Sequence, residues 1–570
     1  MRRIAATALA ALSLFAHAAA SAAEHAAARP RLVVLLVIDG LPMRQVQAFK
    51  PQFGPDGLRR FLDHGVSYSQ AFYAHAHTVT AAGHATLATG AHPARHGIVG
   101  NEWLDRATGA PVYNTEDRAH RYLEGRTAPD AGTSPKNLRV ETFGDALRTR
   151  EPGAKVIGVS GKDRGAILPA GHKGVAYMYR SETGRFTSTT YYMQQHPAWV
   201  NAFNAKRNAE RFWHAEWKPL RPEADYAGSS PDGQPWQGQA GFGNRLPATL
   251  GAGMEAPGER FFTDVLTSPF GDQLTLEFAL AALRNEGLGQ DDIPDVLTVS
   301  LSSHDYINHV FGPESRLSLD HLLQVDRLLQ GFFRELDREV GAGRYALALS
   351  ADHGFLDTPE YRRSKGLPGG RLPVGPALTA LNNHLAAEFG LPKLARGLSA
   401  GTVLFDEAAL AAKGVAMAAV TRSAAGFLQQ LDGIATSYGE ADLASSAAPR
   451  ADQAHLQALR LSWYPPRTGQ LALVPLEGWM YSSRPTGSSH GSSWAYDQQV
   501  PILLWGPAWF GQGEVKTRVQ PADLAPTLAR TLGLPPLAQA QGQPLPLPKE
   551  GAQEGPQKRR PRTPAATTAR

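Results

Sequence analysis

The 570-residue sequence contains no cysteine, which excludes disulfide bonds and thiolate metal sites. Any metal ion must therefore be bound by histidine, carboxylate or hydroxyl groups. The sequence also lacks an apolar run of the roughly 20 residues that a membrane-spanning helix needs. Its overall composition is close to that of globular proteins, which excludes a disordered, collagen-like or coiled-coil chain.

The excess of positive charge is small and lies at the two ends. Lysine and arginine number 57 against 52 acidic residues, a formal net charge of +5. Residues 1–23 carry +2 of this charge and residues 549–570 carry +4, so residues 24–548 carry −1. A body this close to neutral gives no reason to expect a nucleic-acid partner.

The N-terminus has the features of a secretory signal peptide. Two arginines precede a short apolar run, and the small residues Ser21-Ala22-Ala23 follow. A membrane anchor is the alternative, but the run is too short to span a bilayer. We expect residues 1–23 to be a signal peptide, and the mature chain to be periplasmic or secreted without stable membrane insertion. Residues 549–570, rich in proline, glutamine and arginine, are predicted to form a disordered basic tail.

Four apolar runs, rich in valine, isoleucine and leucine, each stop just before ionisable residues. Such runs are typical of strands that are buried on both faces of a parallel sheet. The runs are 32–38 before Asp39, 156–159 before Lys162 and Arg164, 296–301 before Asp305, and 345–350 before Asp352 and His353. Because ligands of these sheets bind at the carboxyl ends of the strands, we expect these side chains to meet at one edge.

Helical patterns alternate with the strands. A 3.6-residue period of leucine and phenylalanine predicts one long helix over about 315–340. The alternation predicts an α/β fold, with a central, mostly parallel sheet and helices on both faces. We expect residues 24–548 to form one domain, with loop-rich insertions near 205–260 and 356–485 that wall the site. The second insertion contains an alanine-rich helical stretch near 405–431.

The ionisable residues suggest a metal centre. Asp305 and His309 are four residues apart, so on one helical turn they face the same way and can share a metal ion. Taken singly, each group has a simpler explanation: a surface Asp/His pair, or Asp39 as a helix cap. Together, carboxylates and imidazoles without thiolates suit two Zn²⁺ or similar divalent ions.

A nucleophile is suggested by Thr80, which precedes the small residues Ala81, Ala82 and Gly83. At the start of a helix, the helix dipole and a nearby metal would both favour an alkoxide. The alternative is that Thr80 only caps this helix.

These residues resemble the alkaline phosphatase superfamily, and most closely its secreted, phosphate-irrepressible members, which use a threonine nucleophile. The resemblance covers about residues 31–545. It is carried by the phrases Val37-Ile38-Asp39-Gly40, Thr80-Ala81-Ala82-Gly83-His84, His96-Gly97-Ile98-Val99-Gly100-Asn101, Thr189-Thr190-Tyr191-Tyr192-Met193 and Ser489-His490-Gly491-Ser492.

The resemblance implies an alkaline phosphatase-like catalytic domain with two zinc ions per chain. One ion would be bound by Asp305, His309 and His490. The other would be bound by Asp39, Asp352, His353 and the Thr80 oxygen. Thr80 would attack phosphorus to form a phospho-threonine, while Asn101, Lys162 and Arg164 would bind phosphoryl oxygens. The implied substrates are small phosphate monoesters.

Two other functions stay open at this stage. One is a phosphodiesterase or nucleotide pyrophosphatase of the same superfamily, and the other is a catalytically silent, metal-binding periplasmic protein. The Lys162/Arg164 pair favours the monoesterase, because a monoester carries an additional negative charge. The remaining histidines of these segments are expected to be structural: His75, His77, His84, His92, His96, His304 and His321.

Overall fold

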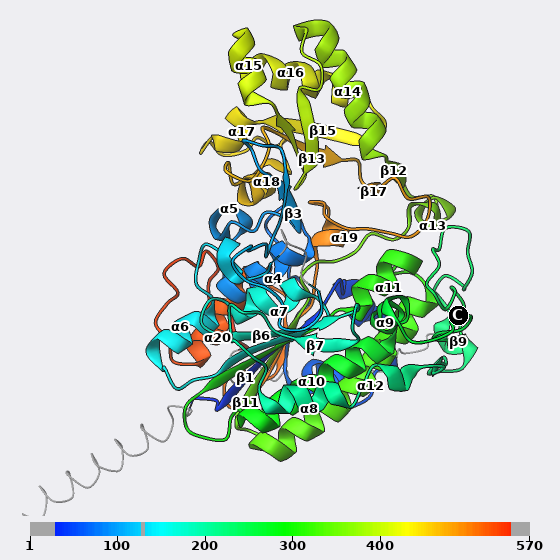
Figure 1. The fold of residues 1–570 in the computed structure, drawn as a ribbon, viewed down its shortest axis with the longest axis vertical. Coiled ribbons are helices and arrows are strands. Elements are labelled where there is room, and N and C mark those ends of the chain that lie inside the picture. The colour runs from blue at the N-terminus through cyan, green and yellow to red at the C-terminus, as the bar shows by residue number, and fades with distance from the viewer. Residues whose placement is uncertain (1–28, 127–131, 549–570) are drawn as a thin grey trace, which may run out of the picture.

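A nine-stranded mixed sheet forms the centre of the molecule, in the order β19-β2-β18-β11-β1-β10-β5-β6-β7 (Figure 1). The computed structural model describes residues 29–126 and 132–548, so the predicted signal peptide and the predicted basic tail lie outside the described residues. The strands of the sheet are β1 (Leu32–Ile38), β2 (Val66–Tyr68), β5 (Val156–Ser160), β6 (Val175–Arg180), β7 (Arg185–Thr187), β10 (Asp295–Leu301), β11 (Tyr345–Ser350), β18 (Ile502–Trp505) and β19 (Gly513–Val515).

The four apolar runs form strands, as predicted, and these strands are adjacent in the sheet. Strand β1 pairs in parallel with β10 on one side and β11 on the other, and β10 pairs in parallel with β5. Antiparallel pairing begins only farther out, where β18 pairs with β11 and β7 pairs with β6. The prediction of a mostly parallel central sheet is therefore confirmed.

Strand β1 is buried on both faces. Its even-numbered residues, from Leu32 to Ile38, belong to one hydrophobic core, and Val33, Leu35 and Val37 belong to another. Helices α10 (Pro269–Glu286) and α12 (Arg316–Leu336) pack into the first core, while α6 (Phe143–Arg150) and α20 (Leu524–Thr531) contribute to the second. Helices therefore cover both faces of the sheet, which explains why these strand sequences are apolar throughout.

The long helix predicted over 315–340 is α12. It begins after Ser315, whose side chain accepts a hydrogen bond from the backbone N–H of Ser318, and a short π-helix at Asp337–Gly341 follows it. Its leucine and phenylalanine side chains pack into the core beneath the sheet.

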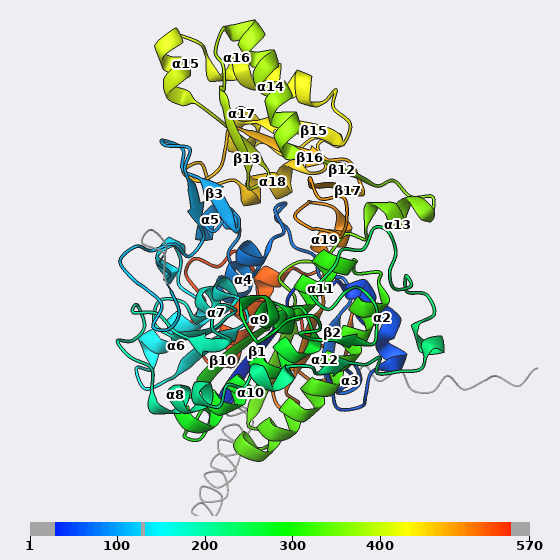
Figure 2. The ribbon, with the colours of Figure 1, turned by 45° about the vertical axis from the view of Figure 1, so that its right-hand side comes forward.

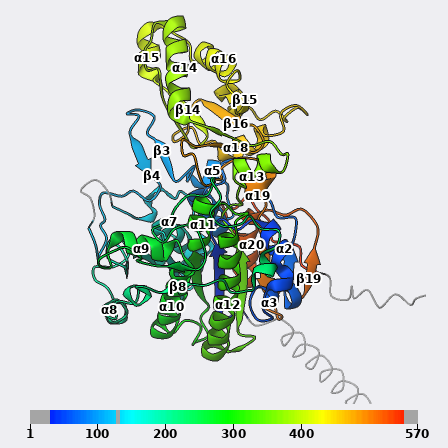
Figure 3. The same ribbon diagram turned by 90° about the vertical axis from the view of Figure 1, so that its right-hand side faces the viewer.

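A second lobe stands at one end of the molecule, away from the central sheet (Figure 2, Figure 3). It contains a four-stranded antiparallel sheet and a hydrophobic core of its own. The alanine-rich stretch is helical, as predicted, and it forms two helices because Gly414 ends the first with a left-handed φ of +64°. The elements of the lobe are α14 (Val374–Phe389), β13 (Ala395–Ser399), β14 (Thr402–Phe405), α15 (Glu407–Lys413), α16 (Met417–Leu428), β15 (Ile434–Gly439), α17 (Glu440–Ala444), α18 (Leu456–Ser462) and β16 (Leu471–Pro475).

Residues 205–258 are largely irregular, with the short ribbon β8 (Glu216–Trp217) and β9 (Ala248–Thr249). This segment packs into the main core, where the buried Trp217 indole donates a hydrogen bond of 2.8 Å to Asp320 on α12. Among the described residues, no helix has the length and apolar character needed to cross a membrane.

The remaining elements connect these parts. They are α2 (Met43–Phe49), α3 (Leu58–His64), α4 (Thr80–Thr89), α5 (Pro93–His96), β3 (Glu102–Leu104), β4 (Pro111–Tyr113), α7 (Asp163–Ala170), α8 (Ala198–Ala205), α9 (Glu259–Leu266), α11 (Ser303–Phe311), α13 (Pro359–Ser364), β12 (Gly370–Leu372), β17 (Trp479–Tyr481) and α19 (Ala495–Gln498).

Helix α4 touches the backbone that follows β11 at Gly83, where an added Cβ would lie 2.0 Å from the Asp352 carbonyl oxygen. We therefore expect Gly83→Ala to force α4 away from the sheet edge and to lower the free energy of unfolding by about 1–3 kcal/mol. Denaturant-induced unfolding measures this change. The matched control is Gly331→Ala in α12, where an added Cβ meets nothing within 4 Å and should stabilise by about 0.5–1 kcal/mol. Equal stability of the two variants would contradict the close approach.

Candidate active site

The predicted site residues meet at the carboxyl edge of the parallel strands. Asp39 follows β1 directly, Asp352 and His353 follow β11, and Lys162 immediately precedes α7 after β5. Helix α11, after β10, carries Asp305 and His309. Thr80 is the first residue of α4, and His490 lies in the loop before α19. Residues more than 400 positions apart in the sequence thus surround one point.

Three imidazoles and two carboxylates form two overlapping groups with the spacing of metal ligands. One group is Asp305, His309 and His490, and the other is Asp39, Asp305 and His353. His309 Nε2 lies 3.3 Å and His490 Nε2 3.6 Å from Asp305 Oδ1, while His353 Nε2 lies 3.5 Å from Asp39 Oδ1. Asp305 therefore belongs to both groups.

Asp352 is next to the second group. Its Oδ2 atom lies 3.5 Å from His353 Nε2, and its Oδ1 atom accepts a hydrogen bond from the Gly40 backbone N–H. Asp352 thus lies beside His353, and Asp305 Oδ1 lies 3.9 Å from His353 Nε2.

Backbone carbonyls fix the protonation of the three rings. His309 Nδ1 bonds to the Ser488 carbonyl at 3.0 Å, His353 Nδ1 to that of Gly354 at 2.9 Å, and His490 Nδ1 to that of Thr78 at 2.8 Å. A carbonyl only accepts, so each Nδ1 carries the proton and donates it. In the neutral imidazole, each Nε2 then presents a lone pair to the centre, as ligand histidines do.

The carboxylates present free acceptors to the same centre. Within the described part of the chain, Asp39 Oδ1, Asp305 Oδ1 and Asp352 Oδ2 are buried and accept no hydrogen bond. Buried polar atoms are nearly always satisfied in native proteins. Three unsatisfied oxygens beside three imidazole lone pairs form a donor set that fits divalent cations with nitrogen and oxygen ligands.

Burial sets the charge states of these groups. Burial, followed by the Asp352 charge, raises the pKa of Asp39 well above its ordinary value. For Asp305 burial acts in the same direction, but His309 and Lys162 outweigh it and hold the pKa well below the ordinary value. Burial lowers the pKa of His353 and of His490. Both rings are therefore neutral near pH 7, which is the form that binds metals.

Lys162 lies against the acidic groups. Its Nζ atom is 2.7 Å from Asp39 Oδ2 and 2.5 Å from Asp305 Oδ2, and it lies 4.8 Å from the centre of the Tyr306 ring. Burial alone would lower the pKa of Lys162, but these two carboxylates raise it above its ordinary value. The ammonium group thus balances the carboxylate charge, a contact that the sequence did not suggest.

Thr80 faces the same centre. Its side chain is buried, and its Oγ1 atom lies 3.5 Å from His353 Nε2. Val79 is the N-cap residue of α4, so the alternative role of Thr80 as a cap is wrong. Asn101 is held beside it, because its Oδ1 accepts a hydrogen bond of 2.9 Å from the Ala81 backbone N–H. The Asn101 Nδ2 group donates to no described residue and is free to bind an anion.

Other histidines support the site instead of lining it. His84 bonds to the Thr80 carbonyl at 2.9 Å and to Ser300 Oγ at 2.8 Å, and it lies 3.2 Å from Asp352 Oδ2. His304 and His321 bond to each other at 3.0 Å, which joins α11 to α12.

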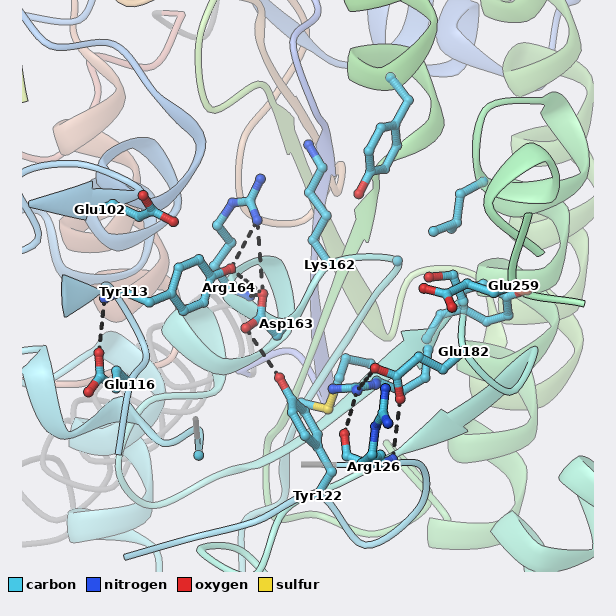
Figure 4. Close-up of a pocket in the computed structure, with 18 of the residues that line it drawn as sticks. Glu102, Tyr113, Glu116, Tyr122, Arg126, Lys162, Asp163, Arg164, Glu182 and Glu259 are labelled. Carbon is cyan, nitrogen blue, oxygen red and sulfur yellow. Dashed lines mark hydrogen bonds and ion pairs between the residues drawn. The ribbon is translucent and has the colours of Figure 1, made fainter. Parts of the chain in front are cut away.

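Sequence reasoning missed Tyr113, Tyr306 and Asp163, which surround Lys162 and Arg164 in a cavity of about 610 Å³ (Figure 4). For Asp163, its place between two predicted site residues was a usable signal. The tyrosines belong to no motif.

Comparison with known proteins identifies the family. A family model for type I phosphodiesterase / nucleotide pyrophosphatase matches residues 33–494. The chain belongs to this family. Alkaline phosphatase PhoV of Synechococcus elongatus is 35% identical over 508 residues, which cover 89% of this chain and 90% of PhoV. Alkaline phosphatase PafA of Elizabethkingia meningoseptica is 33% identical over 525 residues, which cover 91% of this chain and 95% of PafA.

The fold agrees with this assignment. The crystal structure of wild-type PafA matches with a TM-score of 0.84 at 31% identity, and the match covers 91% of this chain and 98% of that one. This member of the type I phosphodiesterase / nucleotide pyrophosphatase family is an enzyme of the alkaline phosphatase superfamily.

Two buried neutral histidines that follow α4 make the stability of the protein depend on pH. Burial lowers the pKa of His92 to about 4 and that of His96 to about 3. Below about pH 6.5 the unfolded chain protonates these rings while the folded chain does not. The free energy of unfolding therefore decreases as the pH is lowered. Each ring should contribute about 1.4 kcal/mol per pH unit. Unfolding curves between pH 6.5 and 4.5 measure this slope.

His96→Gln should make the slope shallower by about one proton, whereas His64→Gln, on the exposed end of α3, should leave it unchanged. An unchanged slope in His96→Gln would show that the ring is not buried in its neutral form.

Proposed function

We propose that this chain is an exported, two-zinc alkaline phosphatase that hydrolyses phosphate monoesters through a phospho-threonine at Thr80. The observation that carries the proposal is the cluster of three Nε2 lone pairs and three unsatisfied carboxylate oxygens beside the Thr80 hydroxyl. Alkaline phosphatases of similar sequence over nearly the whole chain support the choice of reaction.

The donor set divides between two ions. Asp305, His309 and His490 would hold one zinc, and Asp39, Asp352, His353 and the Thr80 oxygen the other. Zinc ions bound there would supply positive charge that favours the Thr80 alkoxide and stabilises the leaving oxygen. The neutral state of His353 and His490 and the backbone contacts of their Nδ1 atoms prepare these rings for that role.

Thr80 supplies the attacking oxygen. It begins α4, so the positive end of the helix dipole favours negative charge on its hydroxyl and on the incoming phosphoryl group. The oxygen would displace the alcohol from phosphorus, and water would then hydrolyse the phospho-threonine and restore the hydroxyl. Asn101 Nδ2 is free to donate to a phosphoryl oxygen, because its Oδ1 is already bonded to Ala81.

Lys162 and Arg164 supply charge for a monoester. A monoester dianion has three non-bridging oxygens, and one of them needs a cation when the metals and Asn101 engage the other two. In a diester that oxygen is bonded to a second organic group and carries no charge. The family's name makes phosphodiester hydrolysis the second candidate, and these two side chains are the feature that favours the monoesterase.

Replacing Lys162 and Arg164 together with alanine should lower kcat/KM for a phosphomonoester by about 10²–10³ or more, the scale of lost transition-state charge contacts. Phosphodiester hydrolysis should change much less. Steady-state kinetics on both substrate types, in wild type and the double variant, measure the difference.

Because Lys162 also contacts Asp39 and Asp305, elemental analysis must accompany the kinetics. Both proteins should contain about two zinc ions per chain. Equal losses of kcat/KM for both substrates at full metal content would favour the phosphodiesterase function over the monoesterase. An active wild type without divalent metal would overturn the proposal.

A further inference from the structure

The Arg164 guanidinium is hydrogen-bonded to a hydroxyl group, and the neighbouring carboxylate lies beyond hydrogen-bond distance. Arg164 Nη1 donates a hydrogen bond of 3.1 Å to the Tyr113 hydroxyl, and this hydroxyl donates one of 2.7 Å to Asp163 Oδ1. The Asp163 oxygen itself lies 3.9 Å from Arg164 Nη1. Figure 4 shows Tyr113, at the end of β4, placed beside both side chains at the start of α7.

The Asp163 carboxylate is fixed from several directions. Its Oδ1 also accepts the Arg164 backbone N–H at 2.8 Å, and its Oδ2 accepts the hydroxyls of Thr115 at 3.1 Å and Tyr122 at 3.5 Å. A carboxylate with this many donors has little freedom to move. It is therefore a fixed hydrogen-bond acceptor for the Tyr113 hydroxyl.

This arrangement leaves the guanidinium fork free. A direct Arg–Asp pair commonly uses two parallel N–H donors and would point the fork at the protein. Here only Nη1 is engaged, and Arg164 Nε is buried without a hydrogen-bond partner among the described residues. Arg164 lines the same cavity as Lys162. Tyr113 thus acts as a spacer between Arg164 and its nearest carboxylate.

We propose that Tyr113, anchored by Asp163, is a positioning residue that holds the Arg164 guanidinium toward the phosphoryl group of a monoester. The inference rests on the proposed function. Without the Tyr113 hydroxyl, Arg164 would close the 3.9 Å gap and pair directly with Asp163. The guanidinium donors would then no longer be available to bind the substrate, although the Arg164 side chain remains.

Tyr113→Phe tests this inference, since it removes only the hydroxyl. We expect kcat/KM for a phosphomonoester to fall by about tenfold, the scale of one lost charged hydrogen bond, while phosphodiester hydrolysis stays within about twofold. In an Arg164→Ala background, Tyr113→Phe should cause no further loss, because the two residues act as one unit. The matched control is Tyr122→Phe, which removes another hydroxyl from Asp163 without touching Arg164, and it should stay within about twofold of wild type.

Thermal unfolding establishes that each variant is folded. Equal losses for monoester and diester, or the same loss in the Arg164→Ala background, would overturn the inference and give Tyr113 a general structural role. A crystal structure of Tyr113→Phe separates this inference from the proposed function. Arg164 paired directly with Asp163 supports the spacer role, and an unmoved guanidinium overturns it. A wild type without phosphomonoesterase activity would instead overturn the proposed function.

Discussion

Three carboxylates buried at one point are the constraint on which the rest of the structure depends. Asp39, Asp305 and Asp352 lie 3.5–3.9 Å from one imidazole nitrogen, His353 Nε2, and each has an oxygen that accepts no hydrogen bond from the described residues. Burying like charges together is costly unless positive charge lies among them. Lys162 supplies one such charge, and the geometry of the remaining donors suits divalent cations. The proposed binding of an anionic ester would meet the same demand for charge balance.

The framework holds these groups in spite of their repulsion. Strands β1, β10 and β11 are adjacent and buried, so the positions of the residues that follow them are set by the register of the sheet. Helix α4 approaches the Asp352 backbone at Gly83, and His84 ties Thr80 to Asp352 and Ser300. The packed core thus holds the like charges of the carboxylates close together.

Much of this could be predicted from the sequence, because the parallel strands are apolar throughout and end at ionisable residues. The same reasoning placed Asp305 and His309 on one helical turn. It could not reveal that Lys162 pairs with Asp39 and Asp305, since this depends on side-chain conformation. Nor could it find Tyr113, which comes from a short ribbon with no motif. It also missed the separate core of the second lobe, because β16 pairs with β14 and β15 from distant parts of the sequence and leaves no local pattern.

The central claim is that Thr80 takes up the phosphoryl group before water does, and stereochemistry at phosphorus tests it most directly. The substrate is a phosphomonoester made chiral with oxygen isotopes, and the phosphoryl group is transferred to an acceptor alcohol. Two successive in-line displacements, first by Thr80 and then by the acceptor, each invert the configuration. The account therefore predicts overall retention, and overall inversion would show a single displacement without a phospho-threonine.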